Sequence, residues 1–193
     1  MLRTFIAFDL DENTRNEFLE LTYKCKSVYP KEMNWVDPAN LHFTYFFLGD
    51  IVPSDKKTVI NLVADLTNNL PVLHLEKGEL KWDSLSKPHC LWIEYLISSA
   101  CNTDFHNVRK KFIYDIKQAI PYLELDKRDF KCHLTLGRVK KKESKTIDIS
   151  KWALAEEIFE KEITLSQISV YQSILYPQGP VYKPLAIFNL KGE

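Results

Sequence analysis

Hydrophobic and polar residues alternate with period two along several short stretches, and segments with helical spacing separate these stretches. The alternation predicts strands over residues 3–10, 41–48, 72–82, 90–96, 130–139, 162–173 and 181–190. The helical spacing predicts helices over residues 12–28, 53–68, 102–119 and, in a short form, 149–159. Strands and helices therefore alternate along the chain, and the second half repeats the first loosely.

Turn and cap residues set the expected ends of these elements. Asp11 offers an N-cap to the first helix, and Pro30 ends it. Gly49 and Asp50 follow the strand over 41–48 and are expected to break it. We therefore expect this strand, like the one over 130–139, to run directly into a turn.

Two of the predicted strands carry the same short pattern, a histidine and a threonine two residues apart. The first copy is His42 and Thr44, and the second is His133 and Thr135. A strand places residues two apart on one face, so each histidine shares a face with its threonine. The repetition predicts two similar half-structures that present matched side chains to a shared cleft.

Composition narrows the class of protein. The 26 basic and 26 acidic residues cancel, so no overall positive field is available to hold a long nucleic acid through many phosphates. The four cysteines lack metal-site or redox spacing, no segment resembles a signal peptide, and no apolar run approaches the ~20 residues of a membrane span. We expect a cytoplasmic monomer with reduced thiols and no membrane association.

Four stretches, in order, resemble the two-histidine (2H) phosphoesterases, and in particular the RNA 2′,3′-cyclic phosphodiesterases, also called 2′-5′ RNA ligases. The two signatures resemble residues 35–49 and 133–138, and the opening and closing stretches resemble residues 3–10 and 173–182. The resemblance covers nearly the whole chain. It implies an α+β fold with two lobes in a single domain over residues 1–193, antiparallel sheets lining a central cleft, and helices packed outside.

The resemblance also implies the reaction: hydrolysis of RNA ends bearing a 2′,3′-cyclic phosphate to 2′-phosphomonoesters, with no metal and no cofactor. Opening this cyclic diester needs a base for water and an acid for the leaving oxygen, and imidazole serves either task near neutral pH. The resemblance assigns His42 as acid and His133 as base, although the sequence itself leaves the order open. Thr44 and Thr135 are the expected phosphate-binding pair.

Two further positions are expected to bind the nucleobase. In the family, an arginine at the place of Arg138 and an aromatic residue at the place of Phe47 sandwich the base. On a regular strand, Arg138 would lie on the face opposite to His133, unless the strand ended near Gly137. Phe47 is equally consistent with a core position.

Alternative functions stay open at this point. One is 2′-5′ ligation of tRNA halves, or hydrolysis of a small cyclic or 2′-5′-linked nucleotide. Another is a nucleotide- or RNA-binding module without turnover, since a fold does not guarantee activity. Simple binding would not require two titrating histidines, so the complete repeat favours the enzyme.

Overall fold

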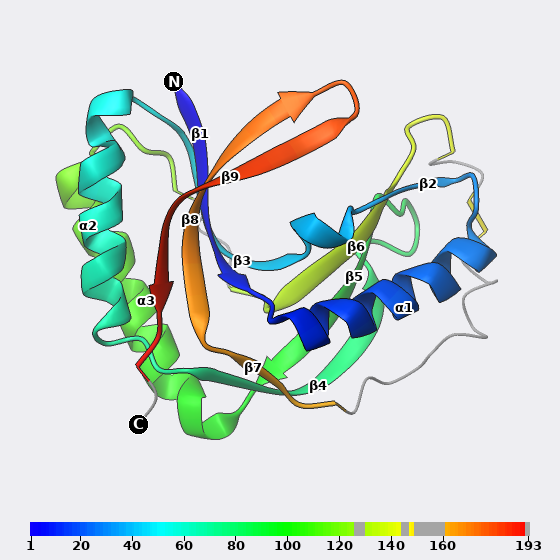
Figure 1. Cartoon of the computed structure of the whole chain (residues 1–193), viewed down its shortest axis with the longest axis horizontal. Coiled ribbons are helices and arrows are strands. Elements are labelled where there is room, and N and C mark those ends of the chain that lie inside the picture. The colour runs from blue at the N-terminus through cyan, green and yellow to red at the C-terminus, as the bar shows by residue number, and fades with distance from the viewer. Residues whose placement is uncertain (126–129, 144–146, 149–160, 192–193) are drawn as a thin grey trace.

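The computed structural model describes residues 1–125, 130–143, 147–148 and 161–191 (Figure 1). In chain order, its elements are β1 (Leu2–Asp9), α1 (Glu12–Val28), β2 (Met33–Trp35), the 3₁₀ turn η1 (Pro38–Asn40), β3 (His42–Ile51), the 3₁₀ turn η2 (Pro53–Asp55), α2 (Lys56–Thr67), β4 (Leu73–Trp82), β5 (Cys90–Ile97), α3 (Ser99–Ala119), β6 (His133–Val139), β7 (Ile163–Leu165), β8 (Gln167–Tyr176) and β9 (Gly179–Asn189).

The described strands form one curled antiparallel sheet. Its order is β7-β4-β5-β6-β3-β1-β8-β9, and β2 pairs with β6 beside this path. Helices α2 and α3 lie side by side on one flank, and the tip of the β8–β9 hairpin projects on the opposite side (Figure 1). The sheet therefore has a concave side that the helices leave open.

The sheet contains two related halves that meet at its middle. The unit β1-α1-β3 recurs as β5-α3-β6, with β3 and β6 as the two central strands. These central strands pair at a single position, Phe43 with Leu134. Beyond it the neighbour of β6 becomes β2, where Trp35 pairs with Gly137. The two lobes thus diverge from the Phe43–Leu134 pair.

Each helix follows from a local signal and buries one face. The side chain of Asp11 accepts a hydrogen bond from the Thr14 backbone N–H at 2.8 Å and so caps α1. Phe105, Phe112 and Ile116 lie on the buried face of α3. Tyr45 of β3 packs against Phe105 and Phe112, with ring centroids 5.7 and 6.1 Å apart. Each such buried ring contributes about 1.5–3 kcal/mol, which fixes the helices to the outer side of the sheet.

The predicted α+β class, with antiparallel strands around a cleft and helices outside, is confirmed, and the two lobes share one continuous sheet. The helix over 12–28 matches α1 to the residue. The predicted break at Gly49 is wrong, because β3 continues to Ile51 and Gly49 adopts a left-handed φ of 75° within it. The short β2 was not predicted, and the strand over 162–173 is divided into β7 and β8. The helix over 149–159 lies outside the described residues.

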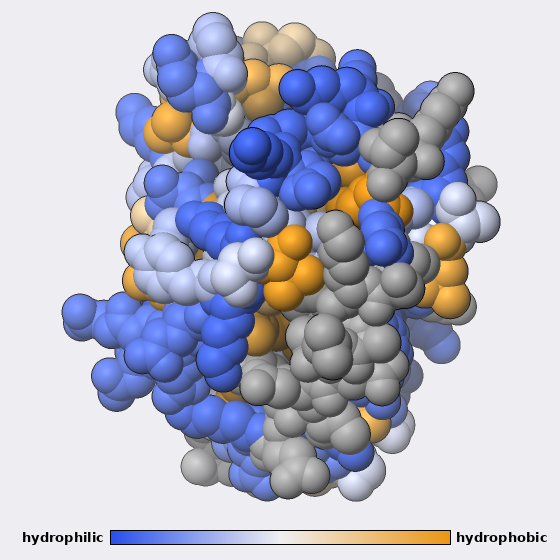
Figure 2. Space-filling view, turned by 90° about the vertical axis from the view of Figure 1, so that its right-hand side faces the viewer, coloured by the Kyte–Doolittle hydropathy of each residue, from blue (hydrophilic) through white to orange (hydrophobic). Residues whose placement is uncertain are grey.

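The described part of the chain contains no helix that is both long and apolar enough to cross a membrane. Figure 2 shows the face at the right of Figure 1, where hydrophilic residues prevail among the coloured atoms and hydrophobic residues form small separate groups.

Candidate active site

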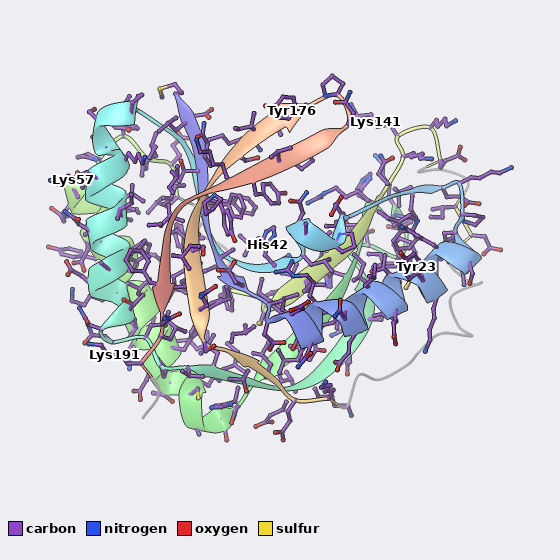
Figure 3. The ribbon with its side chains drawn as sticks, viewed as in Figure 1. Tyr23, His42, Lys57, Lys141, Tyr176 and Lys191 are labelled. Atoms are coloured by element: carbon purple, nitrogen blue, oxygen red, sulfur yellow. The ribbon has the colours of Figure 1, made fainter. Side chains whose placement is uncertain are left out.

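A cleft of about 1640 Å³ opens on the concave side of the sheet, at the place where the two lobes diverge. All six residues that the sequence analysis singled out line this cleft: His42, Thr44, Phe47, His133, Thr135 and Arg138. The first three come from β3 and form the His42 half-site; the other three come from β6 and form the His133 half-site. Figure 3 shows His42 near the centre of the molecule. The fold therefore brings the two copies of the motif together.

Both motif strands carry a β-bulge at the same place. Ile6 of β1 pairs with Phe46 and the next residue pairs with Thr44, so Tyr45 is the extra residue in β3. Likewise, Leu91 of β5 pairs with Gly137 and the next residue pairs with Thr135, so Leu136 is the extra residue in β6. Each extra residue stands three positions after the motif histidine. A bulge shifts the alternation of faces by one residue.

This shift explains where Phe47 and Arg138 point. The expectation that Arg138 would face away from His133 unless the strand ended is wrong, because β6 continues to Val139 and the bulge at Leu136 turns Arg138 to the cleft. Phe47 occupies the matching place in β3 and is 55% exposed, so it is not a core residue. The two strands show the same order of buried and exposed residues from each histidine onward.

Each imidazole is held through its Nδ1 atom by a backbone carbonyl two residues earlier. His42 Nδ1 lies 2.7 Å from the Asn40 carbonyl oxygen, and His133 Nδ1 lies 2.9 Å from the Lys131 carbonyl oxygen. Because a carbonyl oxygen only accepts, each Nδ1 must carry the proton. Nε2 is then left as the atom that can give or take a proton in either half-site.

The rings around the two histidines differ. The His42 ring lies between Phe5 and Tyr182, with centroid distances of 5.0 and 5.3 Å. His133 contacts Trp92 of β5 at 4.9 Å. Phe5 in turn stacks on Tyr171 of β8, which extends the apolar wall behind His42. The His42 half-site is thus the more apolar of the two.

This surrounding lowers the pKa of His42 to about 4. Burial of the imidazole is the main cause, because it disfavours the charged form. The hydrogen bond to the Asn40 carbonyl opposes the effect, while the positive charges of Arg15 and Arg138 and the neighbouring His133 add to it. In the ligand-free protein, His42 is therefore neutral at pH 7.

The two threonine hydroxyls also have different partners. Thr44 Oγ1 lies 3.1 Å from His42 Nε2, which accepts its proton. Thr135 Oγ1 accepts from the Cys90 thiol at 3.9 Å. Burial raises the pKa of Cys90, so this thiol keeps its proton at neutral pH. Both hydroxyls lie in the cleft on the same side as their histidines.

The cleft continues beyond the two half-sites. Arg3 and Lys140 contribute positive charge to its lining, and the tip of the β8–β9 hairpin contributes Tyr176 and Gln178. The Asn40 side-chain amide donates to the Pro180 carbonyl oxygen at 3.0 Å and ties the hairpin to η1. The cleft is thus lined from both lobes and from the hairpin.

Sequence reasoning missed Asn40, Phe5, Trp92 and Tyr182 as neighbours of the histidines. Asn40, Phe5 and Tyr182 had one signal, their places in stretches that resemble the 2H phosphoesterases. Phe5 and Trp92 come from strands adjacent to the motif strands, and their roles depend on strand pairing that the sequence does not display. Within the described residues, no group of three or more His, Cys, Asp or Glu side chains is arranged to hold a metal ion.

Comparison with known proteins relates the chain to one family. A family model described as LigT like Phosphoesterase matches residues 111–182. An RNA 2′,3′-cyclic phosphodiesterase of Archaeoglobus fulgidus is 28% identical over 193 residues, which cover 97% of this chain and 100% of the relative. A protein of the same name from Aquifex aeolicus is 28% identical over 195 residues, covering 100% of this chain and 99% of the relative. The similarity therefore extends over both lobes.

Solved structures share the fold. The protein TT0787 of Thermus thermophilus superimposes with a TM-score of 0.80 at 21% identity, over 100% of both chains. E. coli LigT in its apo form gives a TM-score of 0.69 at 20% identity, over 98% of this chain and 97% of that one. The predicted resemblance to the two-histidine phosphoesterases is confirmed, because the chain is similar both to the LigT-like phosphoesterase model and to relatives named RNA 2′,3′-cyclic phosphodiesterase.

Proposed function

We propose that the protein hydrolyses RNA ends bearing a 2′,3′-cyclic phosphate and leaves a 2′-phosphomonoester. One observation carries the proposal: the two His-x-Thr units stand in a single cleft with the same strand geometry and the same Nδ1 hydrogen bond. Relatives similar over nearly the full chain bear the name RNA 2′,3′-cyclic phosphodiesterase. Both half-sites come from one chain, which supports a monomeric enzyme.

In the proposed reaction, water attacks the phosphorus and the bond to the 3′-oxygen breaks. His133 Nε2 takes a proton from the water, and His42 Nε2 gives a proton to the departing 3′-oxygen. The hydroxyls of Thr44 and Thr135 donate to the non-bridging oxygens, where negative charge must be stabilised in the transition state. The phosphate remains on the 2′-oxygen.

The acid role requires a proton on His42, whose pKa in the ligand-free protein is lowered to about 4. The substrate phosphate carries a negative charge, and an opposite charge beside an imidazole raises its pKa. Substrate binding would therefore supply the electrostatic condition under which His42 holds its second proton. In this scheme the protonated acid forms together with the enzyme–substrate complex.

Phe47 and Arg138 would hold the terminal nucleobase. They occupy matching places in the two strands, and both line the cleft. An aromatic ring and a guanidinium plane can both stack on any base, so the site would select the phosphate end more strongly than the base. The balanced charge of the chain favours recognition of an RNA end over a long phosphate backbone.

The test is to incubate the purified protein with EDTA and a short RNA ending in a 2′,3′-cyclic phosphate, and to identify the phosphate position in the product. His42→Ala and His133→Ala should each lower kcat by about 10²–10⁴-fold. His106→Ala is the matched control, because His106 is an exposed histidine of α3 outside the cleft. Strong inhibition by EDTA, or a 3′-phosphate product, would contradict the proposed reaction.

The pH dependence offers an independent check on the pair of histidines. A paired acid and base give a bell-shaped dependence of kcat on pH, with one limb for each group. The kcat/KM profile reports the free enzyme, in which the lowered pKa of His42, about 4, should set one of the two limbs. A kcat/KM value that stays constant between pH 3 and 9 would exclude paired acid–base catalysis.

A further inference from the structure

The β8–β9 hairpin reaches His42 by two separate contacts. In the first, the Asn40 side chain donates to the Pro180 carbonyl oxygen at 3.0 Å, while the Asn40 backbone carbonyl accepts from His42 Nδ1 at 2.7 Å. In the second, the Tyr182 ring lies edge-on to the His42 ring, with an interplanar angle of 86°. The hairpin therefore acts on the Nδ1 side of this imidazole through Asn40, and it contacts the ring directly through Tyr182.

The Tyr182 ring is itself held in place. It makes an edge contact with Phe5, with centroids 4.9 Å apart, and Phe5 lies 5.0 Å from His42. The three rings form a closed triangle in which each restricts the rotation of the others. Tyr182 is partly buried there, and burial raises the pKa of its hydroxyl, so the side chain is neutral at physiological pH.

The tip of the same hairpin also lines the cleft, and Leu175 of β8 pairs there with Pro180 of β9. Leu175 and Tyr176 are 64% and 52% exposed, and both belong to the cleft lining. Figure 3 shows Tyr176 near the hairpin tip, well away from His42 at the centre. The tip of the hairpin thus lines the cleft and, through Pro180 and Tyr182, also contacts the surroundings of His42.

The other half of the sheet has a different construction. In the repeat, β8 corresponds to β4, and the outer strand next to β4 is β7, which has only three residues. The imidazole of His133 packs on Trp92 of the adjacent strand β5 instead. The contact between an outer hairpin and a motif histidine is therefore specific to the His42 half-site within the described residues.

We infer that Tyr182 and Asn40 are positioning residues that hold the His42 imidazole in the orientation for proton transfer. This inference rests on the proposed function and names residues that support it. In-line proton transfer needs Nε2 within hydrogen-bond reach of the departing oxygen, and a misplacement of about 1 Å can cost about 10²-fold in rate. Asn40 fixes the rotation of the ring through Nδ1, and Tyr182 packs against the ring and restricts its movement.

The charged and titratable groups around His42 come from several elements. Arg15 of α1 and His133 and Arg138 of β6 act on it electrostatically. Asp9 of β1 pairs with His42 in the strand register, but its carboxylate accepts from Ser169 and Tyr171. A change at Tyr182 leaves these groups in place, so its effect on His42 reports on the ring contact itself.

The experiment compares Tyr182→Ala, Tyr182→Phe and Asn40→Ala, with Ile187→Ala as a matched control for the hairpin. Ile187 is a 54% exposed residue of β9 that does not line the cleft. One readout is the NMR titration of the His42 ring in the ligand-free protein. The other is the separate measurement of kcat and KM with the cyclic-phosphate RNA.

We expect Tyr182→Ala to admit water to His42 and to move its titration midpoint upward, toward the ordinary value of about 6.5. Its kcat should fall by about tenfold or more, with KM changed by less than about twofold. Tyr182→Phe retains the ring and should restore both values. Asn40→Ala should lower kcat to a similar extent, and Ile187→Ala should change neither readout.

Two results would overturn the inference. If Tyr182→Ala raises KM but leaves the His42 titration unchanged, Tyr182 contacts the substrate and does not position the imidazole. If Ile187→Ala has the same effects as Tyr182→Ala, the residues act only through hairpin stability. The titration is read without substrate, so an absence of turnover in the wild type would defeat the proposed function separately.

Discussion

The two half-sites have the same backbone geometry and differ in the residues that surround it. Each has a histidine, a threonine and a bulge at equal spacing, and each imidazole donates through Nδ1 to a carbonyl two residues back. His42 is enclosed by Phe5 and Tyr182, whereas His133 packs on Trp92. A repeated strand geometry thus places the groups, and unlike neighbours give them unlike properties.

The unlike surroundings of the two histidines bear on the proposed reaction, which needs an acid and a base at once. Two imidazoles in identical surroundings would titrate alike, and an enzyme gains by separating their proton affinities. Burial of His42 lowers its pKa. The last matching position holds Phe47 in one half-site and Arg138 in the other, so the two half-sites offer different contacts to a ligand. Variants of residues in the two half-sites test this comparison.

Among variants that keep both histidines, removal of the threonine hydroxyls should have the largest effect. Thr44→Val and Thr135→Val keep the branched side chain but remove the donor, and each should lower kcat by about 10²–10³-fold. Thr→Ser variants at the same positions keep the hydroxyl and serve as controls. Steady-state kinetics with the cyclic-phosphate RNA measure both. If one valine variant kept the wild-type kcat, the two half-sites would not share the phosphate.

The buried state of His42 should appear in the pH dependence of stability. The folded-state pKa of about 4 lies below the ordinary value, so between these two pH values the unfolded chain binds the extra proton. The free energy of unfolding should therefore decrease as pH falls from 7 to 4, by about 3 kcal/mol from this group. Denaturant unfolding at several pH values measures the decrease.

The control for this effect is His42→Asn, which cannot titrate. Subtracting its unfolding free energy from that of the wild type removes the contribution of the carboxylates, and the difference should decrease toward low pH. The same series with His133→Asn assigns the effect to one half-site. A wild-type minus His42→Asn difference that is constant from pH 7 to 4 would show that His42 is not buried as described.

Loss of the proposed nucleobase contacts should give a smaller effect, which appears in substrate binding. Phe47→Ala and Arg138→Ala each remove one stacking surface and should raise KM by about tenfold, with little change in kcat. Phe47→Tyr and Arg138→Lys are the matched variants, of which only the first retains a planar surface. RNAs that differ in the terminal base should be affected alike. A large change confined to one base would indicate specific hydrogen bonding instead of stacking.

The contact of Cys90 with Thr135 should matter least. A thiol is a weak donor and the distance is 3.9 Å, so Cys90→Ala should lower kcat only about twofold. Cys90→Ser offers a stronger donor at a similar place and should restore kcat. A loss as large as that of Thr135→Val would mean that the thiol, and not the strand, fixes this hydroxyl.

The period of two was sufficient to predict that each motif histidine shares a strand face with its threonine. It failed for Arg138 because a bulge adds one residue to the strand, and the period-two rule assumes that none is added. In the structure the bulge appears as two consecutive buried residues where regular alternation would bury one: Tyr45 and Phe46 in β3, and Leu136 and Gly137 in β6.

The helix ends were predictable where a local cap defines them, as Asp11 does for α1. The neighbours of His42 were not, because Tyr182 and Pro180 are far from it in sequence and reach it through pairing of β8 with β9 and β1. The three-residue β2 was too short to show any period. Features set by neighbouring residues could therefore be predicted from the sequence, whereas contacts made through the pairing of distant strands could not.

The single pairing of Phe43 with Leu134 has a mechanical consequence. Each of these residues stands between the histidine and the threonine of its own motif, so the site sits where the two lobes are joined. Residues next to the point where two lobes are joined move little when one lobe rotates relative to the other. A change in the angle between the lobes would widen or narrow the outer rim of the cleft, while the separation of the two imidazoles stays nearly constant. Ligands of different bulk would then meet the same spacing between the two imidazoles.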